Sequence, residues 1–259
     1  LGFQSPERKL RLVQAGVAAP VVALLRTAPT ASNEDVLASA AHLVASLALT
    51  SAGLEAFQKA GAIATLVSLL GAAPVIADAA ASALWNLSYD AETEKPANCA
   101  EILEAGAIPP LVALLHGGTA YNAAGALCKL TNDAAGAAAI RSAGGIVPLV
   151  ALLHAEAETA ENAAGALINM SVHDQQSGSA ILAALAARPP PPPPHDERPY
   201  LAQLLQTLQR IATQRLRTAE AGDGDAALQQ AIDQAAAVFV ADAELQRART
   251  KLAAVREAA

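Results

Sequence analysis

The most constraining feature of the sequence is a pattern that recurs four times in the same order. Each copy begins with an Ala-Gly pair, and the spacings between successive pair glycines are 45, 45 and 38 residues. A period of this length is typical of repeat proteins, whose units bury their apolar faces only by stacking on their neighbours. The repeats therefore predict an elongated right-handed solenoid with a concave face. The pair glycines are Gly16, Gly61, Gly106 and Gly144.

Each unit is predicted to contain three helices, as the third unit illustrates. We expect its helices at Lys95 to Ala105, Ile108 to His116 and Thr119 to Asn132. Gly106 can take the left-handed conformation that ends the first helix, and the prolines at 109 and 110 suit the start of the second. The second helices carry VVALL (21 to 25), LVSLL (66 to 70) and LVALL (111 to 115 and 149 to 153), and the third carry LVASLAL, ALWNLSYD, ALCKLTND and ALINMSVHD.

Composition supports an all-α fold. Hydrophobic residues make up 53% of the chain but aromatic residues only 3%, so alanine and leucine carry the apolar content. Alanine is the strongest helix former, whereas the β-branched and aromatic residues that favour strands are scarce. The sequence therefore excludes a sheet-rich fold.

Charge and apolar stretches limit the class of partner. The formal net charge is −7, without the basic stripe that phosphate binding requires, so we expect no nucleic acid and a neutral or basic protein or peptide partner.

Residues 36–54 and 60–77 are uncharged and long, but serine, glycine and proline interrupt them, which predicts packed helices and no membrane insertion. Two isolated cysteines predict reduced thiols and an intracellular, cytoplasmic protein. The sequence opens with Leu1, so we expect the native N-terminus to be missing.

The order of these motifs resembles the armadillo repeat. The family pattern is similar to the order found here: Ala-Gly-Ala-Ile, then Pro-x-Leu-Val-x-Leu-Leu, then Asn-Ala-Ala-Gly-Ala-Leu-x-Asn-Leu-Ser. This order most resembles the alanine-rich armadillo repeats of plant and algal proteins. The resemblance covers residues 6 to 174 and implies a right-handed armadillo-type α-solenoid with three helices per repeat. Its four repeats are expected at about 6–50, 51–90, 91–133 and 134–174.

Residues 175–259 are less regular and are interpreted as a degenerate fifth repeat. A polyproline insertion at 189–194 interrupts it, and Pro199 to Leu205 echoes a second helix. After a turn at Gly222 to Asp225, a long helix runs toward the end, so a helical hairpin is expected to cap the solenoid or to pair with a partner helix. The proline run is either a semi-rigid spacer or a ligand for a proline-binding domain.

The resemblance also implies a set of partner-binding residues. In armadillo proteins an asparagine of the third helix lines the concave groove and hydrogen-bonds the backbone of an extended peptide, which Asn86 and Asn169 match. Ser46 and Lys129 stand at the equivalent positions of the first and third units. The alternative is that these asparagines only satisfy backbone groups between helices.

Two further candidates lie close to this ladder. Nuclear-import receptors carry a tryptophan one turn before the asparagine, where this chain has Ser82 in the second unit, so import-cargo recognition is not implied. Trp85 is adjacent to Asn86 and is either a packed residue between repeats or a binding hot spot. Because the chain has one tryptophan, we expect no row of aromatic anchors on the concave face.

No catalytic, metal or cofactor motif accompanies the repeats. The sequence lacks a nucleophile elbow, a P-loop, a dinucleotide fingerprint and a complete calcium loop. The main hypothesis is therefore a non-enzymatic scaffold that binds an extended segment or subunit of another protein. Two alternatives remain open: the substrate-recruiting part of a U-box ubiquitin ligase, which the resemblance implies, and a structural subunit of a large assembly.

Overall fold

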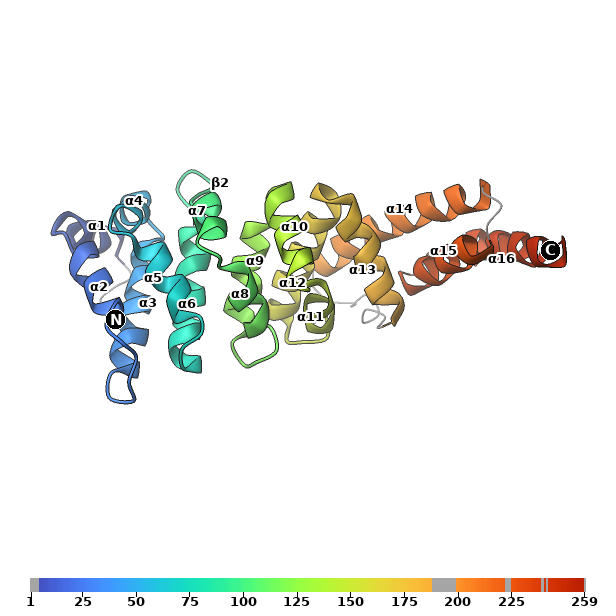
Figure 1. The fold of residues 1–259 in the computed structure, drawn as a ribbon. Coiled ribbons are helices and arrows are strands. Elements are labelled where there is room, and N and C mark those ends of the chain that lie inside the picture. Colours follow the sequence, from blue (N-terminus) through green and yellow to red (C-terminus); the bar gives the residue numbers. More distant parts are fainter. Residues whose placement is uncertain (1–4, 188–198, 222–224, 239, 241, 259) are drawn as a thin grey trace. The chain divides into compact units, whose positions relative to one another are not determined.

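The structure, a computed structural model, describes residues 5–187, 199–221, 225–238, 240 and 242–258 (Figure 1). These residues form α-helices and one two-stranded β-pair, which confirms the all-α prediction. They divide into two compact units, residues 1–143 and 144–259. The predicted boundary at residue 174 lies inside the second unit and stays a prediction.

Unit 1 contains three complete repeats of three helices and the first helix of the next repeat. The third helices α3, α6 and α9 pack successively, α3 on α6 and α6 on α9. Between these elements lies a core of fully buried aliphatic side chains, among them Leu37, Leu84 and Leu127. The helices are α1 (Pro6–Gln14), α2 (Ala18–Leu25), α3 (Glu34–Leu47), α4 (Ser51–Lys59), α5 (Ala62–Leu69), α6 (Pro74–Leu87), α7 (Cys99–Glu104), α8 (Ile108–Leu114), α9 (Ala120–Leu130) and α10 (Ala134–Ser142).

The sequence punctuation has the predicted conformations. The pair glycine follows the first helix of each unit with a φ between 72° and 78°, in the left-handed region that glycine enters without steric cost. In the third unit this residue is Gly106, and α8 begins just after it with prolines in its first turn. The missing proline N–H groups would have no helical partner at that place.

Two junctions between repeats are very short and depend on a second glycine. After α3, the Thr50 hydroxyl accepts a hydrogen bond from the Gly53 N–H at 3.1 Å and caps α4. After α9, Asp133 Oδ1 accepts in the same way from the Gly136 N–H at 2.8 Å. A Cβ on Gly53 would lie 2.0 Å from the carbonyl oxygen of Leu47, and one on Gly136 would lie 1.7 Å from that of Leu130. Only glycine therefore fits these tight junctions.

The junction between α6 and α7 is longer and folds differently from the prediction. Strands β1 (Tyr89–Asp90) and β2 (Lys95–Pro96) form a small antiparallel hairpin, and α7 begins at Cys99 rather than at Lys95. Pro96 explains the difference, because proline lacks an N–H and disfavours a helical conformation in the residue before it. Asn98, with φ 51°, then donates its side-chain amide to the Leu87 carbonyl at 2.9 Å.

Asp90 fixes this hairpin to the start of the same repeat. Its carboxylate accepts hydrogen bonds from the Ser51 hydroxyl at 2.9 and 3.0 Å and from the backbone N–H groups of Glu92 and Thr93 at 2.9 and 3.3 Å. Desolvation raises the pKa of Asp90, but the hydrogen bonds from Ser51, Thr93 and Glu92 outweigh it, so the pKa lies below its ordinary value. The ionised carboxylate is therefore the form that stabilises the fold.

We expect Asp90→Asn to lower the stability of the chain at neutral pH. Because the folded-state pKa is depressed, the stabilisation is present above the ordinary aspartate pKa of about 4 and is lost as pH falls through the folded-state value. The urea midpoint of the variant should lie below that of the wild type at pH 7, and the difference should shrink below about pH 4. Glu92→Gln, an exposed change in the same turn, is the control. A difference that stays constant with pH would contradict this role.

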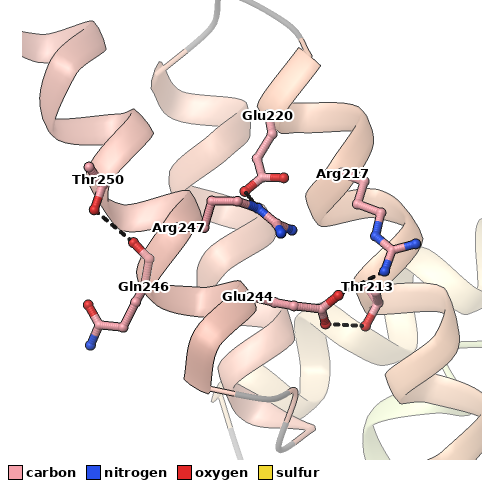
Figure 2. Close-up of polar contacts among 7 residues, drawn as sticks. All are labelled: Thr213, Arg217, Glu220, Glu244, Gln246, Arg247 and Thr250. Atoms are coloured by element: carbon pink, nitrogen blue, oxygen red, sulfur yellow. Dashed lines mark hydrogen bonds and ion pairs between the residues drawn. The ribbon is translucent and has the colours of Figure 1, made fainter.

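Unit 2 begins with the last two helices of the fourth repeat and continues through a further helical layer. Within it, α14 packs along α12, and α15 packs against α13, α14 and α16. Arg217 and Arg247 form ion pairs with Glu244 and Glu220 at 2.8 and 3.1 Å, which join α14 to α16 (Figure 2). The helices are α11 (Ile146–Leu152), α12 (Ala157–His173), α13 (Gln175–Ala187), α14 (Pro199–Ala221), α15 (Asp225–Ala237) and α16 (Asp242–Ala258).

The C-terminal segment differs from the expected two-helix hairpin. The long helix predicted after residue 225 is divided into α15 and α16, and the N–H of Val240 donates to the Ala235 carbonyl at the end of α15. The β-branched Val238 and Val240 at this break are weaker helix formers than the surrounding alanines. The predicted polyproline insertion lies outside the described residues.

Candidate functional site

The predicted binding residues of unit 1 lie in its third helices, and we call the partly exposed surface of these helices the third-helix face. It comprises the residues of α3, α6 and α9, and of β1 after α6, that remain at least partly exposed beside the predicted ladder. In the ladder itself Ser46, Asn86 and Lys129 are half-buried, one on each successive third helix. The other members are Asp78, Ser82, Trp85, Tyr89, Tyr121 and Asn122.

The side chain of Asn86 connects the second repeat to the backbone of the first. Its Nδ2 donates a hydrogen bond of 3.0 Å to the carbonyl of Ala45, in the last turn of α3. The amide therefore performs the structural role that the sequence left open, and its NH₂ group is already occupied. An amide also carries a carbonyl oxygen, and Oδ1 makes no hydrogen bond to the described residues. The acceptor half of Asn86 is available to a ligand.

Ser46 and Ser82 leave their hydroxyls available on the same face. Within the part of the chain that the structure describes, neither hydroxyl has a hydrogen-bond partner. Both side chains are half-buried, and none of the buried polar atoms there lacks a partner, so these two oxygens reach the surface. Together with Asn86 Oδ1, they place unsatisfied hydrogen-bonding groups on adjacent helices.

Trp85 packs between repeats and also borders the face. Its ring meets Tyr121 of α9 edge-on, with centroids 5.3 Å apart and an interplanar angle of 73°. Gly125 lies beneath the indole, because a Cβ on this glycine would come within 2.6 Å of the ring atoms Cδ2 and Cε3. The glycine one turn before the ladder position thus makes room for the tryptophan of the preceding repeat. Trp85 is half-buried, and Tyr121 is 38% exposed.

Three aromatic residues cluster at the step from α6 to α9. Lys129 Nζ lies 4.1 Å from the ring centroid of Tyr89, a cation–π contact between α9 and β1. With Trp85 and Tyr121, this places three of the seven aromatic residues of the chain at the step from α6 to α9. The expectation that the concave face lacks a row of aromatic anchors stays a prediction. Tyr89 and Tyr121 belong to no repeated motif, and they meet Lys129 and Trp85 only because the repeats stack.

A side-chain hydrogen bond also joins α6 to α9 in the N-terminal half of both helices. Asn122 Nδ2 donates to Asp78 Oδ1 at 2.9 Å, joining the first half of α9 to α6. Asp78 is half-buried, and Asp35 at the start of α3 is exposed, so this end of the face is acidic. The cation of Lys129 lies at the other end. The two ends of the third-helix face therefore differ in charge.

Asn169 is the one predicted site residue outside unit 1. It lies in α12 of unit 2, half-buried and four residues before the end of that helix at His173. Gly165 occupies the position one turn earlier and is buried, as is its counterpart Gly125 of unit 1. The local sequence context of Asn169 thus matches that of the third repeat, and its role in binding stays a prediction.

The thiols are poorly suited to chemistry. Desolvation raises the pKa of Cys128 to about 11, only partly opposed by the charge of Lys129. Burial and the charge of Asp133 also raise the pKa of Cys99, whose Sγ donates to the Ser88 carbonyl at 3.3 Å. Neither cysteine forms a disulfide with a described residue. Neither forms an appreciable amount of the nucleophilic thiolate near neutral pH.

The described residues contain neither a metal-binding cluster nor a single helix that could cross a membrane. No group of three or more histidine, cysteine or acidic side chains there could hold a metal ion. No single helix in those ranges is long and apolar enough to cross a membrane, although α10 and α11 reach the required length and composition as a bent pair.

Comparison with solved structures decides the family of the fold. A designed armadillo repeat protein, YIII(Dq)4CqI, superposes with a TM-score of 0.65 at 25% identity over 79% of this chain and 87% of its own. The chain has the armadillo-repeat fold. Computationally designed armadillo repeat proteins for modular peptide recognition give a TM-score of 0.64 at 24% identity, over 80% of this chain and 87% of theirs.

A further armadillo structure is similar along most of the chain. A designed armadillo repeat protein in complex with the peptide (KR)4 has a TM-score of 0.61 and 23% identity, covering 91% of this chain and 86% of its own. No protein-family model matches the sequence, and no curated protein matches it either. The armadillo assignment therefore rests on the arrangement of the helices, together with the repeat pattern.

Proposed function

We propose that this chain is a non-enzymatic armadillo scaffold that binds an extended segment of a partner protein along the third-helix face. The observation that carries the proposal is the set of unsatisfied polar atoms on neighbouring third helices: the Ser46 and Ser82 hydroxyls and Asn86 Oδ1. Hydroxyls and amides can pair with a peptide main chain whatever its side chains are. The aromatic pair Trp85 and Tyr121 beside them supplies apolar contact area.

The partner segment is proposed to be neutral or basic. The residues up to Arg188 include fifteen acidic and nine basic side chains, and the exposed Asp35 lies at one end of the face. A basic segment would gain favourable long-range attraction from this charge. The designed armadillo structure that contains the peptide (KR)4 supports a basic ligand by analogy.

The two other functions receive less support. The substrate-recruiting part of a U-box ligase would use the same face, but the similar armadillo structures described above are designed proteins and lend this function no support. A structural subunit of a large assembly would keep the face permanently covered. The absence of a disulfide between the two described cysteines favours an intracellular location, which belongs to the proposal.

Selection of random extended peptides against the full chain tests the proposed function. We expect enrichment of neutral and basic peptides, whose affinity falls about thirtyfold in the double variant Asn86→Ala with Asn169→Ala, because each lost hydrogen bond contributes about 1 kcal/mol. Ser46→Ala with Ser82→Ala should weaken the same peptides without disturbing the bond between Asn86 and Ala45. Fluorescence anisotropy measures each affinity.

The matched control is Asn132→Ala, an exposed asparagine at the end of α9 that bonds only to the nearby Lys129 carbonyl. The affinity of this variant for the selected peptides should equal that of the wild type. Circular dichroism verifies that every variant is folded. Undiminished capture by both folded double variants would count against the third-helix face.

A further inference from the structure

Lys129 carries a positive charge that no acidic side chain among the described residues balances. Its Nζ lies 4.1 Å from the ring centroid of Tyr89 and forms no ion pair or hydrogen bond with the described residues. Lys129 is half-buried, but none of the buried polar atoms there lacks a hydrogen-bond partner, so Nζ itself reaches solvent. Because the ring covers one side of the ammonium, its other N–H donors are available to a ligand.

The Tyr89 hydroxyl is a second donor beside this cation. Within the described part of the chain it has no hydrogen-bond partner, and by the same reasoning its oxygen lies at the surface. Lys129 Nζ is held against the ring that carries this hydroxyl, so the two groups are close enough to contact one small ligand together. Both groups can donate a hydrogen bond to an anion.

The two carboxylates next to this pair in the sequence are committed to the fold. Asp90 follows the tyrosine, and its carboxylate accepts hydrogen bonds from the Ser51 hydroxyl and from backbone N–H groups of its own turn. Asp133 lies four residues after Lys129, and its Oδ1 caps the start of α10. Neither carboxylate forms an ion pair with the lysine. The charge of Lys129 therefore remains uncompensated although acidic residues flank it.

In the described part of unit 1, this arrangement occurs only at the step from α6 to α9. At the step from α3 to α6, repeat alignment places Leu49 in the position of Tyr89 and Asn86 in that of Lys129. Leu49 is 44% exposed, so the earlier step offers apolar contact and a neutral amide in place of a cation. An extended ligand that crosses both steps would meet a positive charge at the second one alone.

We propose that Lys129 and Tyr89 bind the carboxylate of an aspartate or glutamate in the partner segment. A carboxylate has two acceptor oxygens, one for the ammonium and one for the hydroxyl. A phosphate group would bring more negative charge to a chain whose net charge is already −7, which favours the carboxylate.

This inference rests on the proposed function and specifies the ligand further. The partner segment is neutral or basic as a whole, but it carries an acidic side chain where it crosses from α6 to α9. Because the cation is present at one step, that side chain would fix the register of the segment on the third-helix face.

Two synthetic peptides test the assignment on the full chain. They are the tightest peptide selected against the chain and the same peptide with its acidic residue changed to the corresponding amide. We expect an acidic residue at one fixed place in the enriched peptides and about fivefold weaker binding of the amide version, because an ion pair that solvent partly screens is lost. In Lys129→Met the two versions should bind equally, and in Tyr89→Phe the difference should be smaller than in the wild type. Fluorescence anisotropy measures each affinity.

Lys59→Met is the matched control. Lys59 is an exposed lysine of α4 in the same unit, and its ion pair is with Glu55 of the same helix. This variant removes the same charge as Lys129→Met, but it should keep the preference for the acidic peptide. Equal loss of the preference in both variants would show a general charge effect and overturn the proposal. Tighter binding of a phosphoserine version would assign the site to phosphate and would also overturn it.

The same measurements separate this inference from the proposed function. Enriched peptides that lose affinity in Asn86→Ala with Asn169→Ala, but lack a fixed acidic residue or bind Lys129→Met unchanged, would support the proposed function and overturn the role of Lys129. Failure to enrich any peptide would overturn both. Circular dichroism verifies that each variant is folded, and the comparison of the two peptides on the wild-type chain requires no variant.

Discussion

Gly136→Ala is expected to destabilise unit 1 by about 3 kcal/mol, although alanine is normally favoured over glycine in a helix by about 1 kcal/mol. The added Cβ would lie 1.7 Å from the carbonyl oxygen of Leu130, so the backbone of the junction has to move. That movement would disturb the cap between Asp133 and Gly136. Urea unfolding followed by circular dichroism measures the loss.

Gly118→Ala provides the control for this variant. A Cβ on Gly118 would meet no atom within 4 Å, and the φ of this glycine is outside the left-handed region. The stability of the variant should therefore be unchanged or slightly higher. Gly53→Ala, at the equivalent junction after α3, should behave like Gly136→Ala. A stable Gly136→Ala protein with an unchanged urea midpoint would show that the junction is less rigid than the contacts indicate.

Gly125→Ala is expected to displace Trp85 and to cost about 2 kcal/mol, within the usual range for overpacking. The new methyl group would overlap the indole, which cannot rotate freely because Tyr121 lies against its edge. Trp85 is the only tryptophan of the chain, so intrinsic fluorescence reports this site alone. The emission should shift to longer wavelength as the ring becomes more exposed.

A double-mutant cycle separates this clash from a general effect on the helix. Trp85→Leu alone should be destabilising, but Gly125→Ala in that background should cost far less or become favourable, because the overlapping ring is absent. The free energies of unfolding come from urea titrations followed by circular dichroism. Simple additivity of the two changes would show that Gly125 does not make room for Trp85.

Most of the fold could be predicted because its signals are local and repeated. The four pair glycines indicate left-handed helix ends, and all four have positive φ. The α6 to α7 junction could not be predicted in detail, since its hairpin depends on contacts such as that between Ser51 and Asp90, 39 residues apart. Pro96 was the local signal against a helix that starts at Lys95, and α7 begins at Cys99.

The candidate site was predictable only in part. The ladder of Ser46, Asn86 and Lys129 follows from repeat alignment, and the structure leaves each of them half-buried in the last turn of a third helix. Tyr121 and Tyr89 were missed, because their role depends on which residues of the neighbouring repeat they meet. The glycine at position 125 was a usable signal: a small residue one turn before the ladder leaves space that the Trp85 ring fills.

The alanine-rich contact between α3 and α6 affects which ligands could bind the third-helix face. Alanine has no side-chain rotamers, so the buried Ala41, Ala79 and Ala80 cannot adjust to a partner by changing conformation. Side-chain rotamer changes at these alanines therefore cannot alter the spacing between Ser46 and Asn86. A segment whose own repeat length matches this spacing would bind without reorganising the protein, whereas a mismatched one would have to deform itself. The spacing between α3 and α6 would therefore select ligands by their repeat length.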